Sequence, residues 1–214
     1  MSIDLIVKKR AISELVHFST STGLLGILST GNLLPRSALA NEQSLEFILK
    51  YNAPYRSDPA WLKYVNFSVS RINHQFFDHA GSWHKDPGLF WVIIGMAPEV
   101  LTHDGVYFTT TNNIYPSCLR GKSSDAFEQL FAPKVLGRYS AEILRNPGHP
   151  DHWTTCPQAE VLYPGHVSTK FVQTIYVRNE NDLSAVCAQI AALGVGPYTI
   201  KVAPEKFTSA GIQP

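Results

Sequence analysis

The sequence contains no apolar run long enough to cross a bilayer. Its longest apolar stretch is Leu89–Ala97, well short of the roughly 20 residues that a membrane-spanning helix needs. We interpret this stretch as a buried strand. The N-terminus shows neither the hydrophobic core nor the small-residue cleavage site of a secretory signal. These absences predict a cytoplasmic protein that makes no contact with a membrane.

Cysteine is also scarce. The three cysteines, Cys118, Cys156 and Cys187, are widely spaced and odd in number. This pattern disfavours a disulfide framework, and we expect reduced thiols. The histidines form no familiar ligand spacing, so no metal is predicted.

A large excess of one charge is missing too. The net charge is +1 and charged residues make up 16% of the chain. A dedicated double-helix binder is usually more basic, because much of its affinity comes from neutralised phosphates. The sequence also lacks the G-x-G-x-x-G fingerprint, the phosphate loop and the Gly-x-Ser-x-Gly elbow. These absences disfavour Rossmann domains, phosphate-loop enzymes and elbow-type serine hydrolases.

What the sequence does contain is enough apolar surface for one packed domain over residues 1–214. Apolar residues make up 44% of the chain. A strand over Glu14–Ser19 is followed by a hydroxyl-rich cap and a helix over Gly23–Leu28, which Gly31 is placed to end. Further strands are predicted over Tyr64–Ser70, Leu89–Gly95, Val106–Thr110, Ala159–Tyr163, Val172–Val177 and Tyr198–Val202, and further helices over Ser44–Lys50, Ser123–Phe131 and Asp182–Leu193. Because strands and helices do not alternate regularly, we predict an α+β domain with a mostly antiparallel or split sheet.

Glu160 is the most informative acid in the sequence. It stands at the start of a predicted apolar strand, directly after a loop over 146–157 that is rich in glycine, proline and histidine. A carboxylate where a loop meets the edge of a sheet is a common catalytic position. Taken alone, Glu160 has a second interpretation as an ordinary solvated acid at a strand end.

Two other groups of polar residues are candidates for ligand contacts. His17 and Ser19 lie two residues apart in the first predicted strand, so their side chains point to the same face. They suit a carboxamide or a ribose hydroxyl, although a histidine on an apolar strand is as often a structural residue. Asn112 and Asn113 suit a base edge and Tyr115 suits stacking on a ring. The same asparagines are also ordinary turn formers.

Several segments, taken in order, resemble the DarT family of DNA ADP-ribosyltransferase toxins, which are encoded beside a macrodomain antitoxin, DarG. Val16–Ser19, Leu24–Leu28 and Gly31–Leu34 resemble the family's opening strand, helix and glycine turn. Tyr64–Ser68 resembles its second strand. Gln158–Leu162 resembles the strand that carries the family's catalytic glutamate.

The resemblance implies an ADP-ribosyltransferase fold with NAD⁺ held in a cleft between two small sheets. Glu160 would be the catalytic acid/base, and the loop over 146–158 would recognise the substrate. The family also uses an arginine between the opening helix and the second strand, for which Arg56 is the nearest match and Arg36 and Arg71 are rivals. The implied residues are catalytic Glu160 and Arg56, NAD⁺-binding His17, Ser19, Gly26, Leu33 and Arg56, and substrate-binding Asn112, Asn113, Tyr115, Trp153, Thr154 and Gln158.

The resemblance further implies an acceptor and a partner. The acceptor would be a base of single-stranded DNA, because a base inside a duplex must first leave the stack. Ser70–His74 departs from the proline-rich pattern of the thymidine-modifying branch, which favours the guanine-modifying branch while leaving thymine as the alternative. An RNA or protein acceptor, and a non-catalytic nucleotide-binding module, are competing hypotheses. A DarG-like antitoxin and a toxin role in phage defence are expected, with no metal cofactor.

Overall fold

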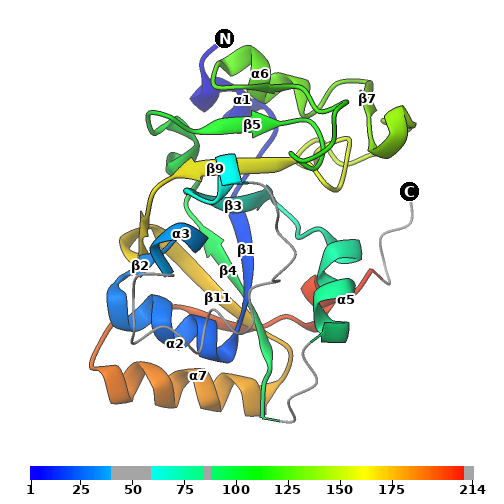
Figure 1. Cartoon of the computed structure of the whole chain (residues 1–214). Coiled ribbons are helices and arrows are strands. Elements are labelled where there is room, and N and C mark those ends of the chain that lie inside the picture. The colour runs from blue at the N-terminus through cyan, green and yellow to red at the C-terminus, as the bar shows by residue number, and fades with distance from the viewer. Residues whose placement is uncertain (40–58, 84–87, 210–214) are drawn as a thin grey trace.

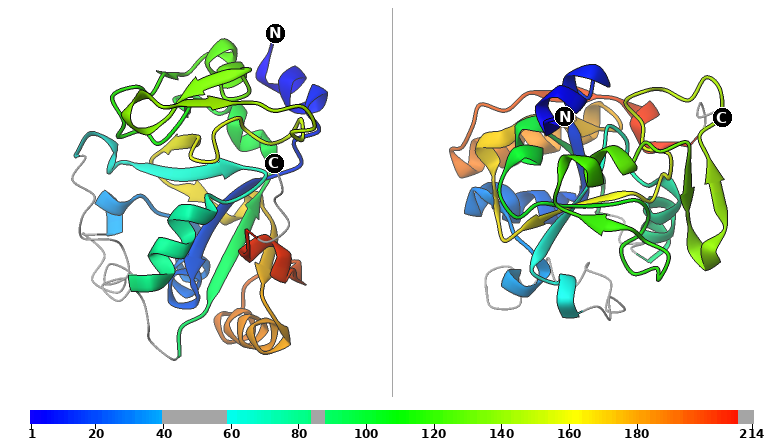
Figure 2. Two further views of the ribbon diagram at one scale, coloured as in Figure 1. Left: turned by 90° about the vertical axis from the view of Figure 1, so that its right-hand side faces the viewer. Right: turned by 90° about the horizontal axis from the view of Figure 1, so that it is seen from above.

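One eight-stranded sheet organises the part of the chain that the computed structural model describes, residues 1–39, 59–83 and 88–209 (Figures 1 and 2). Its order is β12-β11-β4-β1-β3-β9-β5-β6. Only the β11–β12 pair is parallel among the strand pairs of this sheet. The strands are β1 (Leu15–Thr20), β3 (Tyr64–Val69), β4 (Trp91–Met96), β5 (Tyr107–Thr109), β6 (Arg120–Gly121), β9 (Glu160–Pro164), β11 (Val172–Val177) and β12 (Ile200–Val202). The mostly antiparallel sheet predicted from the sequence is confirmed.

The pairing between β1 and β3 is the shortest among the central strands of the sheet. These strands share only the pairs Leu15↔Val69 and Val16↔Ser68, whereas β1 pairs with β4 along its whole length. Beyond Val16 the two strands diverge, and in Figure 1 β3, β9 and β5 cross above β1, β4 and β11. The predicted split therefore exists as two half-sheets joined by a two-pair seam.

Helices cover both halves of the sheet. In Figure 1, α2 and α7 lie together below the sheet, and α1 and α6 lie at its upper end. The helices are α1 (Ile3–Lys9), α2 (Ser21–Thr30), α3 (Arg36–Leu39), α5 (His74–Trp83), α6 (Ser124–Gln129) and α7 (Glu180–Leu193). Short 3-10 turns occupy Pro59–Trp61, Pro98–Thr102, Arg138–Ser140, Thr169–Phe171 and Pro204–Phe207.

Local sequence explains where α2 begins and ends. The Thr20 hydroxyl accepts a hydrogen bond from the Gly23 N–H at 3.0 Å, which satisfies a backbone donor of the first turn. Gly31 adopts the left-handed conformation, with φ of 66°, and closes the helix. Both features were predicted from the sequence.

The core occupies both faces of the central strands. Val92, Ile94 and Met96 of β4 belong to the larger cluster, while Ile93 faces a smaller cluster that includes Phe77 of α5. A strand that is buried on both faces becomes almost continuously apolar, which explains the Trp91–Met96 sequence.

Several helices and strands were not predicted from the sequence. They are α1, α3, α5, β6 and the hairpin formed by β7 (Lys134–Leu136) and β8 (Glu142–Leu144). A further small sheet, also not predicted, pairs β2 (Asn32–Leu33) with β10 (Val167–Ser168). The helix predicted over Ser44–Lys50 lies outside the described residues.

Candidate active site

Glu160 is the first residue of β9, and both of its carboxylate oxygens accept hydrogen bonds. The Asn66 side-chain amide donates to Oε1 at 2.8 Å, and the Asn113 backbone N–H donates to Oε2 at 2.8 Å. Thr109 pairs with Glu160 across β5 and β9, and its hydroxyl accepts the Glu160 N–H at 3.1 Å. The carboxylate is therefore held in one orientation by donors from two different segments.

His17 lies on the other side of the seam and contacts the same asparagine. Its ring Nδ1 is 2.8 Å from the Asn66 carbonyl oxygen, and its ring packs edge-on against Phe67 at 5.8 Å between centroids. A carbonyl oxygen can only accept, so Nδ1 carries the proton. His17 and Glu160 are thus joined through one residue.

Asn66 is the residue that the sequence analysis missed. It lies in β3 opposite Leu162 of β9, so Glu160 is its diagonal neighbour across the strands, a distance that an asparagine side chain can span. Its neighbours Val65 and Phe67 are buried. A polar residue between two apolar ones in an alternating strand was the available signal.

The residues predicted to bind NAD⁺ fall into different environments. Ser19 lies in β1, and its hydroxyl packs so closely against Gly23 that a side chain at position 23 would collide with it. Gly26 is buried within α2. Leu33 is 1% exposed and belongs to the core, and it pairs with Val167 of β10, so it packs within the domain. Arg56 lies outside the described residues.

A cavity of about 460 Å³ opens beside the loop that precedes Glu160. Its walls come from the segment after β3, from the turn after β5, from the β7–β8 hairpin and from the loop before β9. The lining residues include Arg71, His74, Gln75, Tyr115, Arg138 and Gln158.

The segment after β3 carries unsatisfied polar atoms, two of them on residues that line this cavity, Arg71 and His74. Ser70 Oγ, Arg71 Nε and His74 Nδ1 are buried and have no hydrogen-bond partner within the described part of the chain. Burial lowers the pKa of Arg71 and of His74. Ser70 also has a left-handed backbone, with φ of 62°. Buried polar groups are almost always paired, so this segment has the character of a site that awaits a ligand.

The predicted substrate-binding residues divide between this cavity and its supports. Tyr115 and Gln158 line the cavity. Trp153 lies beneath the Arg71 guanidinium, 4.0 Å from the ring centroid. Asn113 is buried and its backbone N–H holds Glu160.

Asn112 and Thr154 make local backbone contacts instead. The Asn112 side-chain oxygen accepts the Ile114 N–H at 3.1 Å, as expected of a turn-forming asparagine. The buried Thr154 hydroxyl donates to the Cys156 carbonyl at 2.8 Å. Neither contact depends on a ligand.

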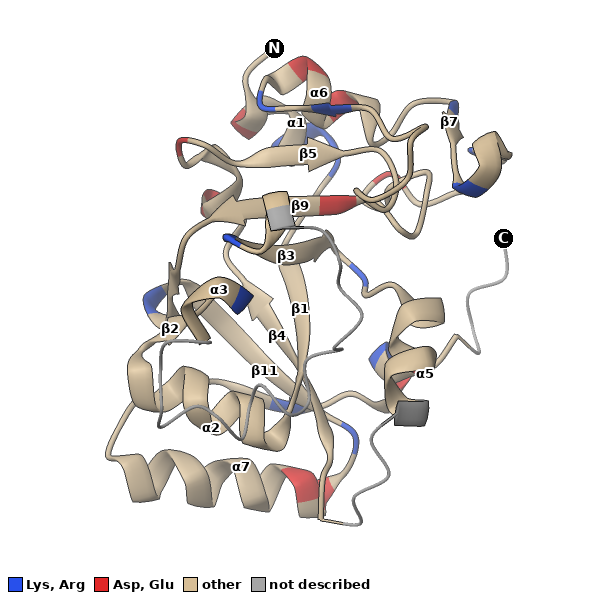
Figure 3. Ribbon diagram, viewed as in Figure 1, with Lys and Arg blue, Asp and Glu red and all other residues tan. Residues whose placement is uncertain are grey.

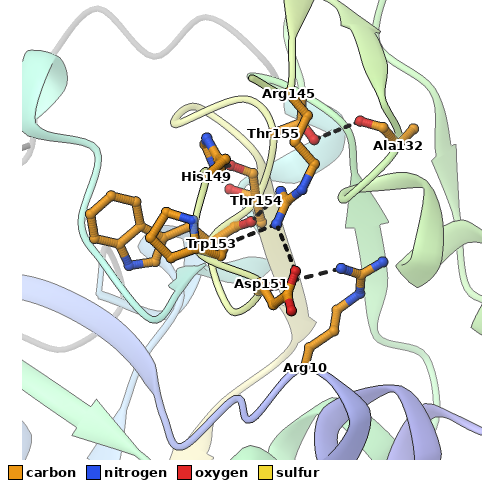
Figure 4. A network of polar contacts seen from close by, with 9 residues as sticks. Arg10, Ala132, Arg145, His149, Asp151, Trp153, Thr154 and Thr155 are labelled. Atoms are coloured by element: carbon orange, nitrogen blue, oxygen red, sulfur yellow. Dashed lines mark hydrogen bonds and ion pairs between the residues drawn. The ribbon is translucent and has the colours of Figure 1, made fainter. Parts of the chain in front are cut away.

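The loop before β9 is braced by arginines (Figure 4). The Arg145 guanidinium donates to the carbonyl oxygens of Trp153 at 2.7 Å and Pro150 at 2.8 Å. Arg10 of the segment after α1 donates to the Asp151 carbonyl at 3.5 Å. These contacts shape the loop without any regular secondary structure.

The remaining chemistry is sparse. All three cysteines are free, with Cys118 and Cys156 buried, as expected from the sequence. In residues 1–39, 59–83 and 88–209, no three His, Cys, Asp or Glu side chains gather into a group that could hold a metal ion. Over the same ranges, no helix has both the length and the apolar character needed to span a bilayer.

Comparison with known proteins identifies the fold. The solved structure of Thermus sp. 2.9 DarT in complex with NAD⁺ is 12% identical, with a TM-score of 0.60 over 92% of this chain and 98% of that one. The same protein in complex with ADP-ribosylated ssDNA is 14% identical, with a TM-score of 0.63 over 92% and 97%. Thermosipho africanus DarTG in complex with ADP-ribose is 13% identical, with a TM-score of 0.57, over 91% of this chain and 51% of that one. At such identities these similarities establish the fold, and the α+β prediction of the ADP-ribosyltransferase type is confirmed.

The family assignment comes from the sequence. A search of curated proteins gave no match. A family model described as "DarT: ssDNA thymidine ADP-ribosyltransferase, DarT" matches residues 16–208, which include Glu160, its contact Asn66 and the cavity-lining residues other than Ser209. The chain therefore belongs to the DarT family of single-stranded-DNA ADP-ribosyltransferases.

Proposed function

We propose that this enzyme transfers ADP-ribose from NAD⁺ to a base of single-stranded DNA, with Glu160 as the catalytic residue. As an ADP-ribosyltransferase, it uses NAD⁺ as co-substrate. The observation that carries the assignment of Glu160 is its carboxylate, fixed by Asn66 and Asn113 and joined through Asn66 to His17. Relatives with this fold have been solved with NAD⁺ and with ADP-ribosylated ssDNA.

The fixed carboxylate suits the donor half of the reaction. When the bond between nicotinamide and ribose breaks, nicotinamide leaves with the bonding electrons and positive charge develops on the sugar. A preorganised carboxylate stabilises that charge without further rearrangement. His17 and Ser19 hold the nicotinamide end and its ribose. Nδ1 of His17 donates to the Asn66 carbonyl, and this contact sets the orientation of the ring beside the donor site.

The acceptor half uses the cavity beside the loop. A base nitrogen attacks the anomeric carbon of the ribose, and Glu160 takes the proton that the nitrogen loses. Tyr115 and Gln158 lie in the cavity wall, where they can stack on the base and bond to its edge. A single strand offers such a base without the free energy of unpairing.

We propose guanine as the acceptor base. Arg71 lines the cavity and its buried Nε has no partner among the described residues, and a bidentate arginine is the commonest specific contact to the O6 and N7 atoms of guanine. Trp153 fixes the plane of that guanidinium. Thymidine, which the family model names, is the second candidate.

One experiment tests both levels of this proposal. NAD⁺ labelled in its adenylate half is incubated with single-stranded oligonucleotides that lack either guanine or thymine, and labelled DNA and free nicotinamide are measured. We expect labelling of the guanine-containing set only, and a loss of about 10³-fold in Glu160→Gln with an unchanged melting temperature. Labelling of the thymine set alone would reverse the base. A parallel incubation with an RNA pool and a protein lysate completes the test: label found only on RNA or protein would reject DNA, and unchanged transfer by Glu160→Gln would remove that residue from the mechanism.

We also propose that a DarG-like macrodomain protein antagonises this enzyme, and that both act in the cytoplasm as a toxin–antitoxin pair in phage defence. Support comes from the family and from the fold shared with a DarTG protein. Co-expression with a macrodomain that removes ADP-ribose from DNA should restore growth to cells that make the wild-type enzyme.

A further inference from the structure

The tip of the β7–β8 hairpin presents an aromatic side chain to solvent. Tyr139 is 87% exposed, more than any other large hydrophobic residue among those described. The hairpin projects from the body of the domain, as the right-hand view of Figure 2 shows. A single exposed apolar residue is common on protein surfaces and does not indicate a binding site. The backbone conformation at Tyr139 is a second, independent observation.

That backbone is unfavourable for a residue with a side chain. Tyr139 has φ of 56° and Ser140 has φ of 59°, two consecutive left-handed residues where glycine or asparagine is the usual choice. Strain of this kind persists where the surroundings impose it and is concentrated at functional sites.

The surroundings of the tip do impose it. The Gly137 N–H donates to the Ala141 carbonyl at 2.8 Å, and the Ser117 hydroxyl donates to the Gly137 carbonyl at 2.7 Å. A Cβ on Gly137 would lie 2.8 Å from Cδ1 of Ile143, closer than real Cβ contacts. These contacts hold the backbone of the tip, from which the Tyr139 side chain projects into solvent.

A cation joins this aromatic ring to the cavity. The Arg138 guanidinium lies 4.8 Å from the centroid of the Tyr139 ring, and Arg138 also lines the cavity beside the loop. Figure 3 shows basic residues on this hairpin. Exposed aromatic faces combined with cations are what proteins use to hold unpaired nucleotides.

We propose that Tyr139 and Arg138 form a stacking subsite for the nucleotide next to the acceptor base in single-stranded DNA. The inference rests on the proposed function and extends it to sequence context. The base stacks on Tyr139, and Arg138 neutralises the phosphate between this nucleotide and the one in the cavity. Because stacking accepts every base, the subsite adds affinity and favours larger rings without reading hydrogen bonds.

The test measures label transfer to oligonucleotides of increasing length around one acceptor base. For a long oligonucleotide, we expect Tyr139→Ala to raise KM about tenfold, with Tyr139→Trp close to wild type. The difference between wild type and Tyr139→Ala should shrink as nucleotides are removed from one side of the acceptor, which identifies the side that the subsite holds. Leu144→Ala, at a residue of the same hairpin that is 57% exposed, is the matched control.

A second variant separates binding from folding. Tyr139→Gly relieves the left-handed strain, so we expect its melting temperature to rise while its KM for the long oligonucleotide rises as in Tyr139→Ala. A melting temperature that falls would mark Tyr139 as structural. An unchanged KM in active Tyr139→Ala, or an equal rise for the shortest substrate, would overturn the subsite alone. Failure of the wild type to label any DNA would overturn the proposed function and this subsite with it.

Discussion

Asn66 serves two neighbours with two different parts of one residue. Its backbone carbonyl accepts from His17 and its side-chain amide donates to Glu160. The backbone contact survives any substitution that keeps β3 in place, whereas the amide contact does not. Asn66 is therefore a positioning residue whose effect on the carboxylate can be measured separately from the fold.

We expect Asn66→Ala to lower kcat about tenfold, equivalent to about 1.4 kcal/mol, because Oε1 of Glu160 loses its donor. The KM for NAD⁺ should change much less. Asn66→Asp should be worse, since it places a second carboxylate beside the first. Steady-state kinetics with a melting curve for each variant would check this. Equal kcat in wild type and Asn66→Ala would show that the amide does not position Glu160.

A second prediction at this scale concerns Arg71. Lysine keeps the charge but loses the planar fork, so Arg71→Lys should lower kcat/KM on guanine-containing DNA by about tenfold or more. Release of nicotinamide in the absence of DNA serves as the internal reference. A variant that labels guanine as efficiently as the wild type would exclude arginine readout of the base.

Sequence reasoning proposed Glu160 and His17 as site residues because each stands in a segment that resembles a family motif. It missed Asn66 because the role of this residue depends on the register between β3 and β9, which pairs Asn66 with Leu162. Arg71 was kept only as one of three candidate arginines. Its guanidinium packs against Trp153, which lies in a loop far later in the chain, and no local pattern could have indicated that contact.

At the scale of elements, the helices and strands with strong local signals were predictable. α7 has an asparagine cap at Asn179 and a left-handed glycine at Gly194, and both are visible in the sequence. The β7–β8 hairpin was not predictable, because its turn uses Tyr139 and Ser140 in the left-handed region where hairpin rules look for asparagine and glycine. α5 begins after Asn73, whose side chain accepts the Phe76 N–H. The helix was not predicted because its sequence contains many polar residues.

The loop before β9 is an element held by a side chain, which leads to a prediction for Arg145. Its side chain is 13% exposed, and lysine cannot donate to the Trp153 and Pro150 carbonyls from one planar group. We expect Arg145→Lys to raise the KM for DNA several-fold and to speed amide hydrogen exchange over residues 149–155. Lys134→Ala, at an exposed ion pair with Glu142, is the control. Unchanged exchange would show that Arg145 does not brace the loop.

At the scale of the whole molecule, a buried acid ties the ends of the chain to the sheet. Glu14, just before β1, accepts from the Lys206 ammonium at 2.6 Å and from the Tyr176 hydroxyl at 2.8 Å. Gly95 of β4 leaves room for the carboxylate, because a Cβ there would collide with it. Residues separated by most of the sequence therefore share one charge cluster.

Lys206→Met should lower the free energy of unfolding by about 2 kcal/mol, because it leaves a buried carboxylate without its cation. The loss is smaller than for a fully buried pair, since the Lys206 side chain is 28% exposed. Adding Glu14→Gln to Lys206→Met should recover part of it. Urea denaturation measures each value, and Lys201→Met in β12 is the surface control. A stability equal to that of the wild type would make the cluster energetically neutral.

The same cluster makes the stability of the fold depend on pH in the alkaline range. Burial and the Glu14 carboxylate raise the pKa of Tyr176 from 10.0 to about 12. The unfolded tyrosine therefore releases its proton first, and the stabilisation present below pH 10 is lost as the pH rises toward 12. Lys206 lies 4.4 Å from the ring centroid and faces the same group. Between these pH values, the free energy of unfolding of Tyr176→Phe should fall less steeply than that of the wild type. Parallel plots of unfolding free energy against pH for the two proteins would reject the assignment to Tyr176.

The two-pair seam between β1 and β3 has a thermodynamic consequence for how the affinities of two ligands depend on each other. His17 belongs to one half-sheet and Glu160 to the other, and Asn66 is their common contact. If NAD⁺ and DNA bind to opposite half-sheets, as proposed, a donor molecule that orders one half can change the affinity of the other half for DNA through Asn66. Linkage makes this influence mutual. If a non-hydrolysable NAD⁺ analogue changes the affinity for an oligonucleotide by some factor, the oligonucleotide must change the affinity for the analogue by the same factor.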